Sequence, residues 1–326
     1  YEKTRYAQQF VKPSTEMIDV PDEAYMDGQI TINSIKMMKR LANKNKPFFL
    51  AVGYKKPHLP FTAPKKYWDL YNRDEIELSR WQEKPVNGPE IAMHNWGELK
   101  SYSDIKEHIE PDGLLDNEKQ AELIHGYFAC VSFIDTQIGE LLNELKNMGL
   151  EKNTIIVLWG DHGWHLGDHG LWCKHSNFEQ ATHSPLIFSA PDTKKEIRNS
   201  SPVEFIDIFP TLCDLAGIEV PGFTDGTSLK PIMTAKDEKV KDFAISQYPR
   251  GNNRMGYSLR TERYRYTAWF SIDFRKGEKA SPEKIIAEEL YDYQNDPLET
   301  KNFADEKSYS KVREELANKL NNFLNM

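Results

Sequence analysis

The sequence predicts an α/β fold, in which a mostly parallel sheet flanked by helices is followed by a small antiparallel sheet subdomain. Over residues 1–235, apolar runs of strand length alternate with longer segments of helical periodicity, which is typical of a mostly parallel sheet. Beyond a stretch rich in Lys and Asp at 230–242, short strand-like runs follow one another directly, which favours antiparallel pairing. We therefore expect two domains, residues 1–235 and residues 236–326, the second a small α+β subdomain.

Each element follows from its local pattern. In the first domain the expected strands are residues 47–54, 154–159 and 185–191, and the expected helices are 31–43, 117–148 and 205–216. In the second domain the expected strands are 243–248, 255–260, 264–270 and 289–293, with a hairpin turn at 261–263 and a final helix at 309–325. Residues 72–116 are polar and have no steady period, so we expect a long surface excursion that borders a binding site.

Composition excludes several classes of protein. The formal net charge of −8 over 326 residues argues against a nucleic-acid-binding protein. No apolar run approaches the roughly 18–20 residues that span a bilayer. The three cysteines form no CxxC motif, so we expect neither a disulfide framework nor a zinc ribbon, and we expect Cys130 and Cys213 to be core residues. The sequence begins at Tyr1 without a basic and apolar leader, so no signal peptide is expected within it.

One loop holds most of the chemistry. The run Thr154–Trp159 leads into a Gly-punctuated segment that contains Asp161, His162, His165, Asp168, His169, Cys173, Lys174 and His175. Open α/β sheets place their active sites at the carboxyl ends of strands. Asp161 and His162 favour a divalent metal over the alternative of a helix cap and a packed ring, and calcium and zinc both remain possible. A surface position is the default for Lys174, and the sequence gives no activating context for Cys173 beyond this lysine.

A second loop follows the expected strand 47–54. His58 lies there between Pro57 and Pro60, and Lys55 and Lys56 make the loop basic. The residues alone do not decide between a catalytic and an exposed histidine. For His183, a hydrogen bond to a backbone carbonyl is favoured slightly over a place in the site. For Asp207, hydrogen bonds from backbone amides are favoured over a chemical role. His94, His108 and His125 are interpreted as structural or surface residues, and Arg250, Arg254 and Arg260 are each weak candidates for anion binding.

At these residues the chain resembles the sulfatase family, and within it the iduronate-2-sulfatase-like branch. The resemblance rests on PFFLAVGYKKPHLPF, ACVSFIDTQIG, DHGWHLGDHG with KHSNFEQATHSPLIF, DIFPTLCDLAGI, SQYPR, MGYSLRTERYRYTAWF and ELYDYQNDPLETKN. These stretches run from about residue 21 to residue 304 in the family's order. The resemblance implies an alkaline-phosphatase-like α/β fold with a small carboxyl-terminal sheet subdomain.

The resemblance also implies roles for individual residues. Asp161 and His162 correspond to two ligands of one calcium ion that holds the sulfate group. His58 corresponds to a histidine that protonates the leaving oxygen, and Lys174 to a lysine that grips a sulfate oxygen. The candidate substrate-binding residues are Lys56, His165, His175 and Arg260; Arg260 is the weakest of them, with holding the site together as its alternative role.

The family's nucleophile motif is absent from this sequence. Sulfatases carry a Cys/Ser-x-Pro-x-Arg motif whose Cys or Ser is oxidised to formylglycine, and none of the three cysteines here has that context. Two early Asp ligands and a basic Lys…His stretch are also missing. We infer that the amino-terminal third of the catalytic domain, with the nucleophile, the remaining calcium ligands and central strands, comes from the same protein or a second chain.

The resemblance therefore implies hydrolysis of a sulfate ester on a sulfated carbohydrate, such as a uronate-2-sulfate or a related glycosaminoglycan, in the periplasm, outside the cell or in a lysosome. The first alternative is a zinc phosphodiesterase or phosphonate hydrolase of the same superfamily, with Asp161, His162 and His183 as metal ligands. The second is a non-catalytic glycan-binding fragment. Metal analysis separates the two enzymes, and the upstream sequence decides whether a nucleophile exists.

Overall fold

The structure is a computed structural model that describes residues 12–44, 46–194, 196–236, 238–251 and 253–325. The chain forms two compact units. The first consists of Tyr1–Arg80 and Trp96–Lys152, and the second of Trp81–Asn95 and Asn153–Met326. The change in sequence pattern near residue 235, where consecutive strands replace alternating helices and strands, lies inside the second unit. A domain boundary there stays a prediction.

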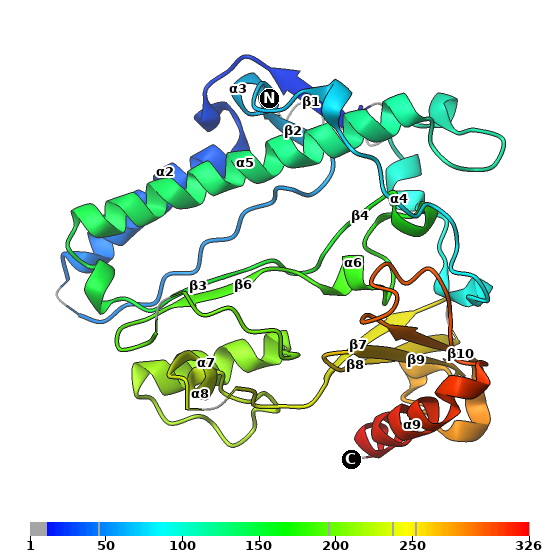
Figure 1. Ribbon diagram of the computed structural model, residues 1–326. Coiled ribbons are helices and arrows are strands. Elements are labelled where there is room, and N and C mark those ends of the chain that lie inside the picture. The colour runs from blue at the N-terminus through cyan, green and yellow to red at the C-terminus, as the bar shows by residue number, and fades with distance from the viewer. Residues whose placement is uncertain (1–11, 45, 195, 237, 252, 326) are drawn as a thin grey trace. The chain divides into compact units, whose positions relative to one another are not determined.

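Two long helices dominate the first unit and run side by side (Figure 1). They are α2 (Met26–Ala42) and α5 (Asn117–Asn147). The carboxylate of Asp116 starts α5 because it accepts the backbone N–H of Lys119 at 2.7 Å, which satisfies one of the unpaired amides of the first turn. The other elements are the parallel strands β1 (Thr15–Ile18) and β2 (Phe61–Pro64) and the short helices α3 (Lys65–Trp68) and α4 (Gly97–Lys100).

The first part of the second unit carries the acidic and basic loop. Strands β3 (Ile156–Trp159) and β6 (Leu186–Ser189) pair antiparallel. Between them lie the two-residue strands β4 (His165–Leu166) and β5 (Trp172–Cys173) and the short helix α6 (Glu179–Thr182). Helices α7 (Ile208–Ala216) and α8 (Lys230–Met233) follow.

The rest of the second unit is an antiparallel sheet with a helix packed on it (Figure 1). The strands lie in the order β10–β9–β8–β7. Their bounds are β7 Ala244–Pro249, β8 Arg254–Arg260, β9 Tyr264–Ser271 and β10 Ile285–Asp292. Leu316 and Leu320 of the final helix α9 (Ser310–Leu324) pack against Leu259, Phe270 and Leu290 of the sheet. Apolar residues on one face of each strand thus supply a core that a single helix closes.

Single 3₁₀ turns connect these elements. They lie at Asp22–Ala24, Arg73–Glu75, Glu90–Ala92, Lys106–His108, Glu151–Asn153, Asp168–Gly170, Phe205–Asp207, Phe274–Lys276, Pro282–Lys284 and Lys307–Tyr309. Three of them fall inside the polar stretch 72–116, together with α4, so that stretch contains only short elements.

The α/β class, the small antiparallel sheet and most elements are confirmed. The expected strand at 47–54 is wrong for this structure, since these residues pair with no other described strand and Phe49 is 80% exposed. Pairing between β3 and β6 is antiparallel because the connection at 160–185 holds only short elements instead of the crossover helix that parallel neighbours need. Cys130 and Cys213 are buried thiols, as expected. Of the described helices, none has the length and apolar character to cross a membrane.

Candidate active site

The loop after β3 presents Asp161 and His162 together. Nε2 of His162 lies 3.5 Å from a carboxylate oxygen of Asp161, whose side chain is 86% exposed. Nδ1 of His162 donates to the backbone carbonyl of Gly163 at 2.8 Å, which leaves the lone pair of the neutral ring on Nε2. An imidazole nitrogen and a carboxylate oxygen therefore face the same outer side of the loop, as a shared cation requires.

The two residues fit part of a metal site. Calcium takes six to eight oxygen-rich ligands and tolerates irregular geometry, so a carboxylate and one imidazole cover only a fraction of its shell. No group of three or more His, Cys, Asp or Glu side chains arranged for a metal ion occurs among the described residues. The zinc set of Asp161, His162 and His183 is thus not assembled here, and the ring of His183 is 77% exposed beside Glu179.

Trp164 connects the metal-ligand candidates with Lys174. The ring of His162 stacks on the Trp164 indole at 5.9 Å between centroids, and Nζ of Lys174 lies 4.9 Å from the centre of a Trp164 ring. The sequence analysis did not identify Trp164 as a functional residue, although it lies in the DHGWHLGDHG motif. The structure therefore gathers His162 and Lys174 around one aromatic side chain.

His165 and His175 differ in their surroundings. His165 is fully buried and its Nε2 bonds the hydroxyl of Ser176 at 2.8 Å. Burial, and then the charges of His169 and His94, lower the pKa of His165 well below its ordinary value, so the ring is neutral. This placement favours a packing role over the expected substrate contact. The half-buried His175 bonds the hydroxyl of Tyr248 at 2.6 Å and stays a candidate for substrate binding.

Arg260 is held by a carboxylate. Its Nε and one terminal nitrogen donate to the two oxygens of Glu179 at 3.0 and 3.1 Å, and its guanidinium lies 3.9 Å above the ring of Tyr293. A bidentate pair occupies the donors that an anionic substrate would use. Of the two roles expected for Arg260, the geometry favours holding the site together.

His58 lies in the first unit. Its Nδ1 donates to the carbonyl of Leu59 at 2.7 Å, and its Nε2 lies 3.1 Å from a carboxylate oxygen of Glu98 on α4. Both neighbours are hydrogen-bond acceptors, and an imidazole that donates a proton from Nε2 can serve as a general acid. Glu98 is a second residue that the sequence analysis missed.

Lys56 supports the loop that carries His58. It is 4% exposed, and its Nζ donates to the carbonyls of Pro60 at 2.6 Å and His58 at 3.3 Å. The buried carboxylate of Asp27 accepts the backbone N–H groups of Lys55 and Lys56 at 2.8 and 3.2 Å. These contacts favour loop positioning over the expected role of Lys56 in substrate binding. The convergence of His58 with the loop of the second unit stays a prediction.

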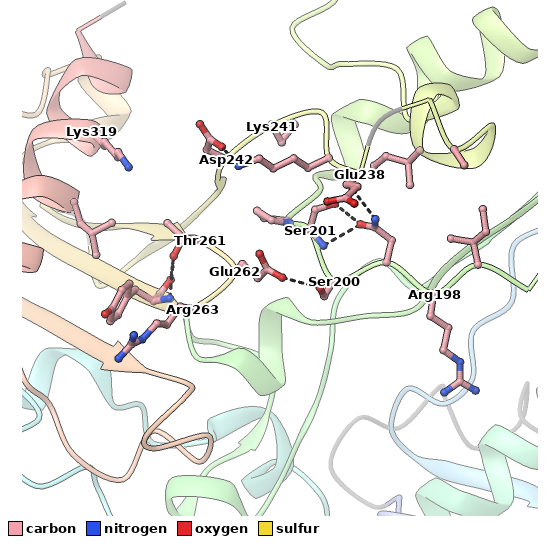
Figure 2. Close-up of a pocket in the computed structure, with 18 of the residues that line it drawn as sticks. Arg198, Ser200, Ser201, Glu238, Lys241, Asp242, Thr261, Glu262, Arg263 and Lys319 are labelled. Carbon is pink, nitrogen blue, oxygen red and sulfur yellow. Dashed lines mark hydrogen bonds and ion pairs between the residues drawn. The ribbon is translucent and has the colours of Figure 1, made fainter.

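A separate pocket lies in the second unit, away from the residues discussed above. It has a volume of about 1010 Å³ between residues 194 and 197–202, the turn after β8 and helix α9, and none of the candidate site residues lines it. Figure 2 shows Ser200 and Glu262 facing each other there, and the serine hydroxyl donates to the carboxylate at 2.9 Å. Most charges of the pocket are already paired, as Lys239 is with Asp242 and Lys319 with Glu315.

Comparison with known proteins identifies the family. The family model described as Sulfatase matches residues 1–218, and the model described as N-sulphoglucosamine sulphohydrolase, C-terminal, matches residues 167–325. The chain belongs to the sulfatase family. This sulfatase chain is 33% identical to iduronate 2-sulfatase of Homo sapiens over 350 residues, which cover 88% of the chain and 63% of that protein. It is also 35% identical to a sulfatase of Formosa agariphila, with 79% of the chain and 46% of that protein covered.

Solved structures agree on the fold of this sulfatase chain. A protein solved in complex with its substrate D-glucosamine-2-N,6-O-disulfate superposes with a TM-score of 0.73 at 24% identity, covering 91% of this chain and 68% of that chain. A phosphonate monoester hydrolase from Silicibacter pomeroyi gives a TM-score of 0.74 at 23% identity, covering 92% of this chain and 60% of that one. The chain spans about two thirds or less of the length of the curated relatives it matches.

Proposed function

We propose that the protein containing this chain hydrolyses sulfate esters on sulfated carbohydrates, with a uronate 2-sulfate or a related glycosaminoglycan sulfate as the substrate class. The observation that carries the proposal is the grouping of Asp161, His162 and Lys174 around Trp164 in a chain of the sulfatase family. The similarity to iduronate 2-sulfatase supports the choice of substrate class.

Each residue of the loop has a separate task in this proposal. Asp161 and His162 supply a carboxylate oxygen and an imidazole nitrogen to one calcium ion, and further polypeptide supplies the other ligands. Calcium, when bound, offsets negative charge on the sulfate oxygens. Lys174 places a fixed ammonium beside a sulfate oxygen, where a water-poor site strengthens its effect on the developing charge. The Trp164 ring keeps this ammonium from extending freely into solvent.

His58 acts as the general acid. Nε2 of His58, which lies beside Glu98, gives a proton to the leaving sugar oxygen. The carbonyl of Leu59 keeps the ring oriented through Nδ1 throughout. Attack on sulfur requires a formylglycine nucleophile, which we assign to polypeptide beyond this sequence.

Further polypeptide also completes the fold. Large apolar side chains are exposed on the second unit, among them Trp159 and Ile187 on the β3–β6 pair and Phe209 on α7. Within the described residues both outer edges of that pair lack a neighbouring strand, and such edges pair readily with another strand. We assign this role to the amino-terminal segment of the same protein or to a second chain, and the completed enzyme to an exported or lysosomal compartment.

Kinetics of the polypeptide as its gene encodes it test the proposal. Replacement of Lys174 or His58 by Ala should lower kcat for a 2-O-sulfated uronate disaccharide by on the order of a hundredfold. Matched controls are Lys276→Ala, an 84% exposed lysine of the second unit, and His108→Ala, a half-exposed histidine that pairs with Asp116 as His58 pairs with Glu98. Near-normal turnover in either test variant refutes the role assigned to that residue.

Zinc-dependent phosphonate or phosphodiester hydrolysis predicts a different result. The same purified protein would then contain zinc instead of calcium and would cleave a phosphonate monoester faster than a sulfate ester. A protein that binds the sulfated disaccharide without turnover, although its loop is intact, would be a glycan-binding protein.

A further inference from the structure

Glu299 is a buried carboxylate far in sequence from the loop of the candidate site. Its side chain is 0% exposed and its backbone lies in the left-handed region, at φ 53°. One oxygen, Oε1, accepts the Arg265 Nε–H at 3.1 Å and the Tyr293 hydroxyl at 2.5 Å. Since a left-handed backbone is unfavourable for a residue with a side chain, the surrounding contacts hold Glu299 in place.

The other oxygen of Glu299 faces both ends of the segment that carries Lys174 and His175. It accepts the backbone N–H of Glu179 at 3.1 Å and lies 3.8 Å from Nε2 of His169. The ring of His169 stacks at 4.4 Å on Phe178, the residue before Glu179. One end of residues 169–179 is therefore hydrogen-bonded to this carboxylate, and the other end lies beside it.

The segment is also tied to the four-stranded sheet. The side chain of Glu179 accepts hydrogen bonds from Arg260, at the end of β8, and from Arg265 on β9. Arg265 bonds both Glu179 and Glu299, so the two carboxylates share one buried guanidinium. Antiparallel strands with a closed core are rigid, and a loop anchored to them keeps its side chains in one arrangement.

We propose that Glu299 is a positioning residue of the sulfatase site, which fixes the segment 169–179 so that Lys174 meets the sulfate group in a single geometry. This inference rests on the proposed function of Lys174. Glu299 itself touches no reacting atom. Its charge is required because it must accept from an amide N–H, a phenol and a guanidinium while buried, and a neutral side chain compensates them less well. Burial raises the pKa of Glu299, but the nearby ring of His169 and the charge of Arg265 outweigh this effect and lower the pKa overall.

Replacement of Glu299 by Gln keeps the shape of the side chain and removes the charge. Hydrogen exchange of peptides from residues 170–178 should become about tenfold faster, whereas peptides from β9 should keep their rates. The matched control is Asp292→Asn, which alters a buried carboxylate whose hydrogen-bond partners include Arg263, Asn295 and Tyr309, all in the carboxyl-terminal part of the chain. Equal exchange of residues 170–178 in wild type and Glu299→Gln overturns the proposal, as does equal acceleration in both variants.

Kinetics provide the second readout, in the polypeptide as its gene encodes it. Glu299→Gln should lower kcat and kcat/KM together by about tenfold, because a contact made in the transition state is lost. In a Lys174→Ala background, the same change should cost less than about threefold, since the group that Glu299 positions is already gone. If Glu299→Gln lowers kcat by the same factor with and without Lys174→Ala, the two changes act independently and the positioning role is overturned.

The two proposals fail in different ways. If Lys174→Ala alone leaves turnover unchanged, the proposed function of Lys174 is wrong, and hydrogen exchange still decides whether Glu299 fixes the segment. If Glu299→Gln does not fold, Arg260→Gln replaces it, because it removes only the outer bonds to Glu179. That variant should accelerate exchange of residues 170–178 in the same direction by a smaller factor, and an unchanged rate counts against the proposal.

Discussion

The ammonium of Lys174 lies 4.9 Å from the centre of a Trp164 ring, while the ring of His162 stacks on the same side chain. One indole thus contacts both a metal-ligand candidate and the lysine proposed to hold sulfate. An aromatic face attracts a cation without neutralising it.

Replacement of Trp164 by Leu should lower kcat/KM for a sulfate ester by about tenfold, which corresponds to the roughly 1–2 kcal/mol of a partly buried cation–π contact. Trp164→Phe keeps an aromatic face and should lose less activity. Steady-state kinetics with both variants test this expectation. If Leu and Phe behave alike, the contact has no role in holding Lys174.

Replacement of Asp161 by Asn should weaken calcium binding by at least about tenfold, because an amide oxygen carries no charge to attract a divalent cation. Metal analysis after equilibrium dialysis against calcium measures this directly. The control is Asp225→Asn, which alters an exposed carboxylate of the same unit. A calcium content that does not change in Asp161→Asn contradicts the ligand assignment, and zinc in the wild-type protein favours phosphonate or phosphodiester chemistry.

Acid should weaken the second unit through Glu179. Burial raises the pKa of this carboxyl, but the hydrogen bond from Arg260 and the charge of Arg265 outweigh it and lower the pKa from 4.5 to about 2. Because the folded-state pKa is the lower one, the stabilisation is fully present above the unfolded pKa and is lost as the pH falls toward 2. The free energy of unfolding should drop by on the order of 3 kcal/mol over that window. Urea titrations at pH 6 and pH 2 measure the drop.

Glu179→Gln should make the same titrations less dependent on pH, because the variant has no carboxyl group to protonate at this position. Glu315→Gln, on the exposed face of α9, serves as the control. An equal acid dependence in wild type and Glu179→Gln is the outcome that this explanation does not allow.

His165 should make stability depend on pH in a milder range. Its ring is neutral in the folded protein and is surrounded by His94, His169, Ser176 and Phe178. Since its folded pKa is lowered from 6.5, the unfolded chain takes up a proton first, and the free energy of unfolding falls as the pH drops below about 6.5. His165→Gln should remove this part of the slope between pH 7 and pH 5, measured by thermal or urea unfolding. His183→Gln, which removes an exposed ring, is the matched control.

Local sequence patterns predicted the elements whose backbone hydrogen bonds are formed between neighbouring residues. Helix α5 was expected at 117–148 and lies at Asn117–Asn147, since its hydrogen bonds and its cap at Asp116 come from neighbouring residues. The segment 47–54 has the apolar and aromatic composition of a strand, yet it pairs with no described strand. A strand requires a partner, and the identity of that partner is not encoded in the segment itself.

The candidate site likewise contains residues that the sequence identified and residues that only the fold revealed. Asp161, His162 and Lys174 lie within one loop, which the sequence alone shows, but only the resemblance to the sulfatase family implied that they act together. Glu98 and Glu299 gave no such signal, because an isolated glutamate in a polar stretch is usually a surface residue. Only the fold brings Glu98 to His58 and Glu299 to the amide of Glu179.

The sequence by itself determined the family, most of the longer helices and strands, and the residue types that could bind a metal and a sulfate group. The tertiary structure decided which of these side chains are free to meet a ligand and which are already engaged, as with the buried His165 and the paired Arg260. The physical reason is that the residue type fixes which functional group a side chain carries, whereas burial and pairing depend on neighbours that are distant along the chain.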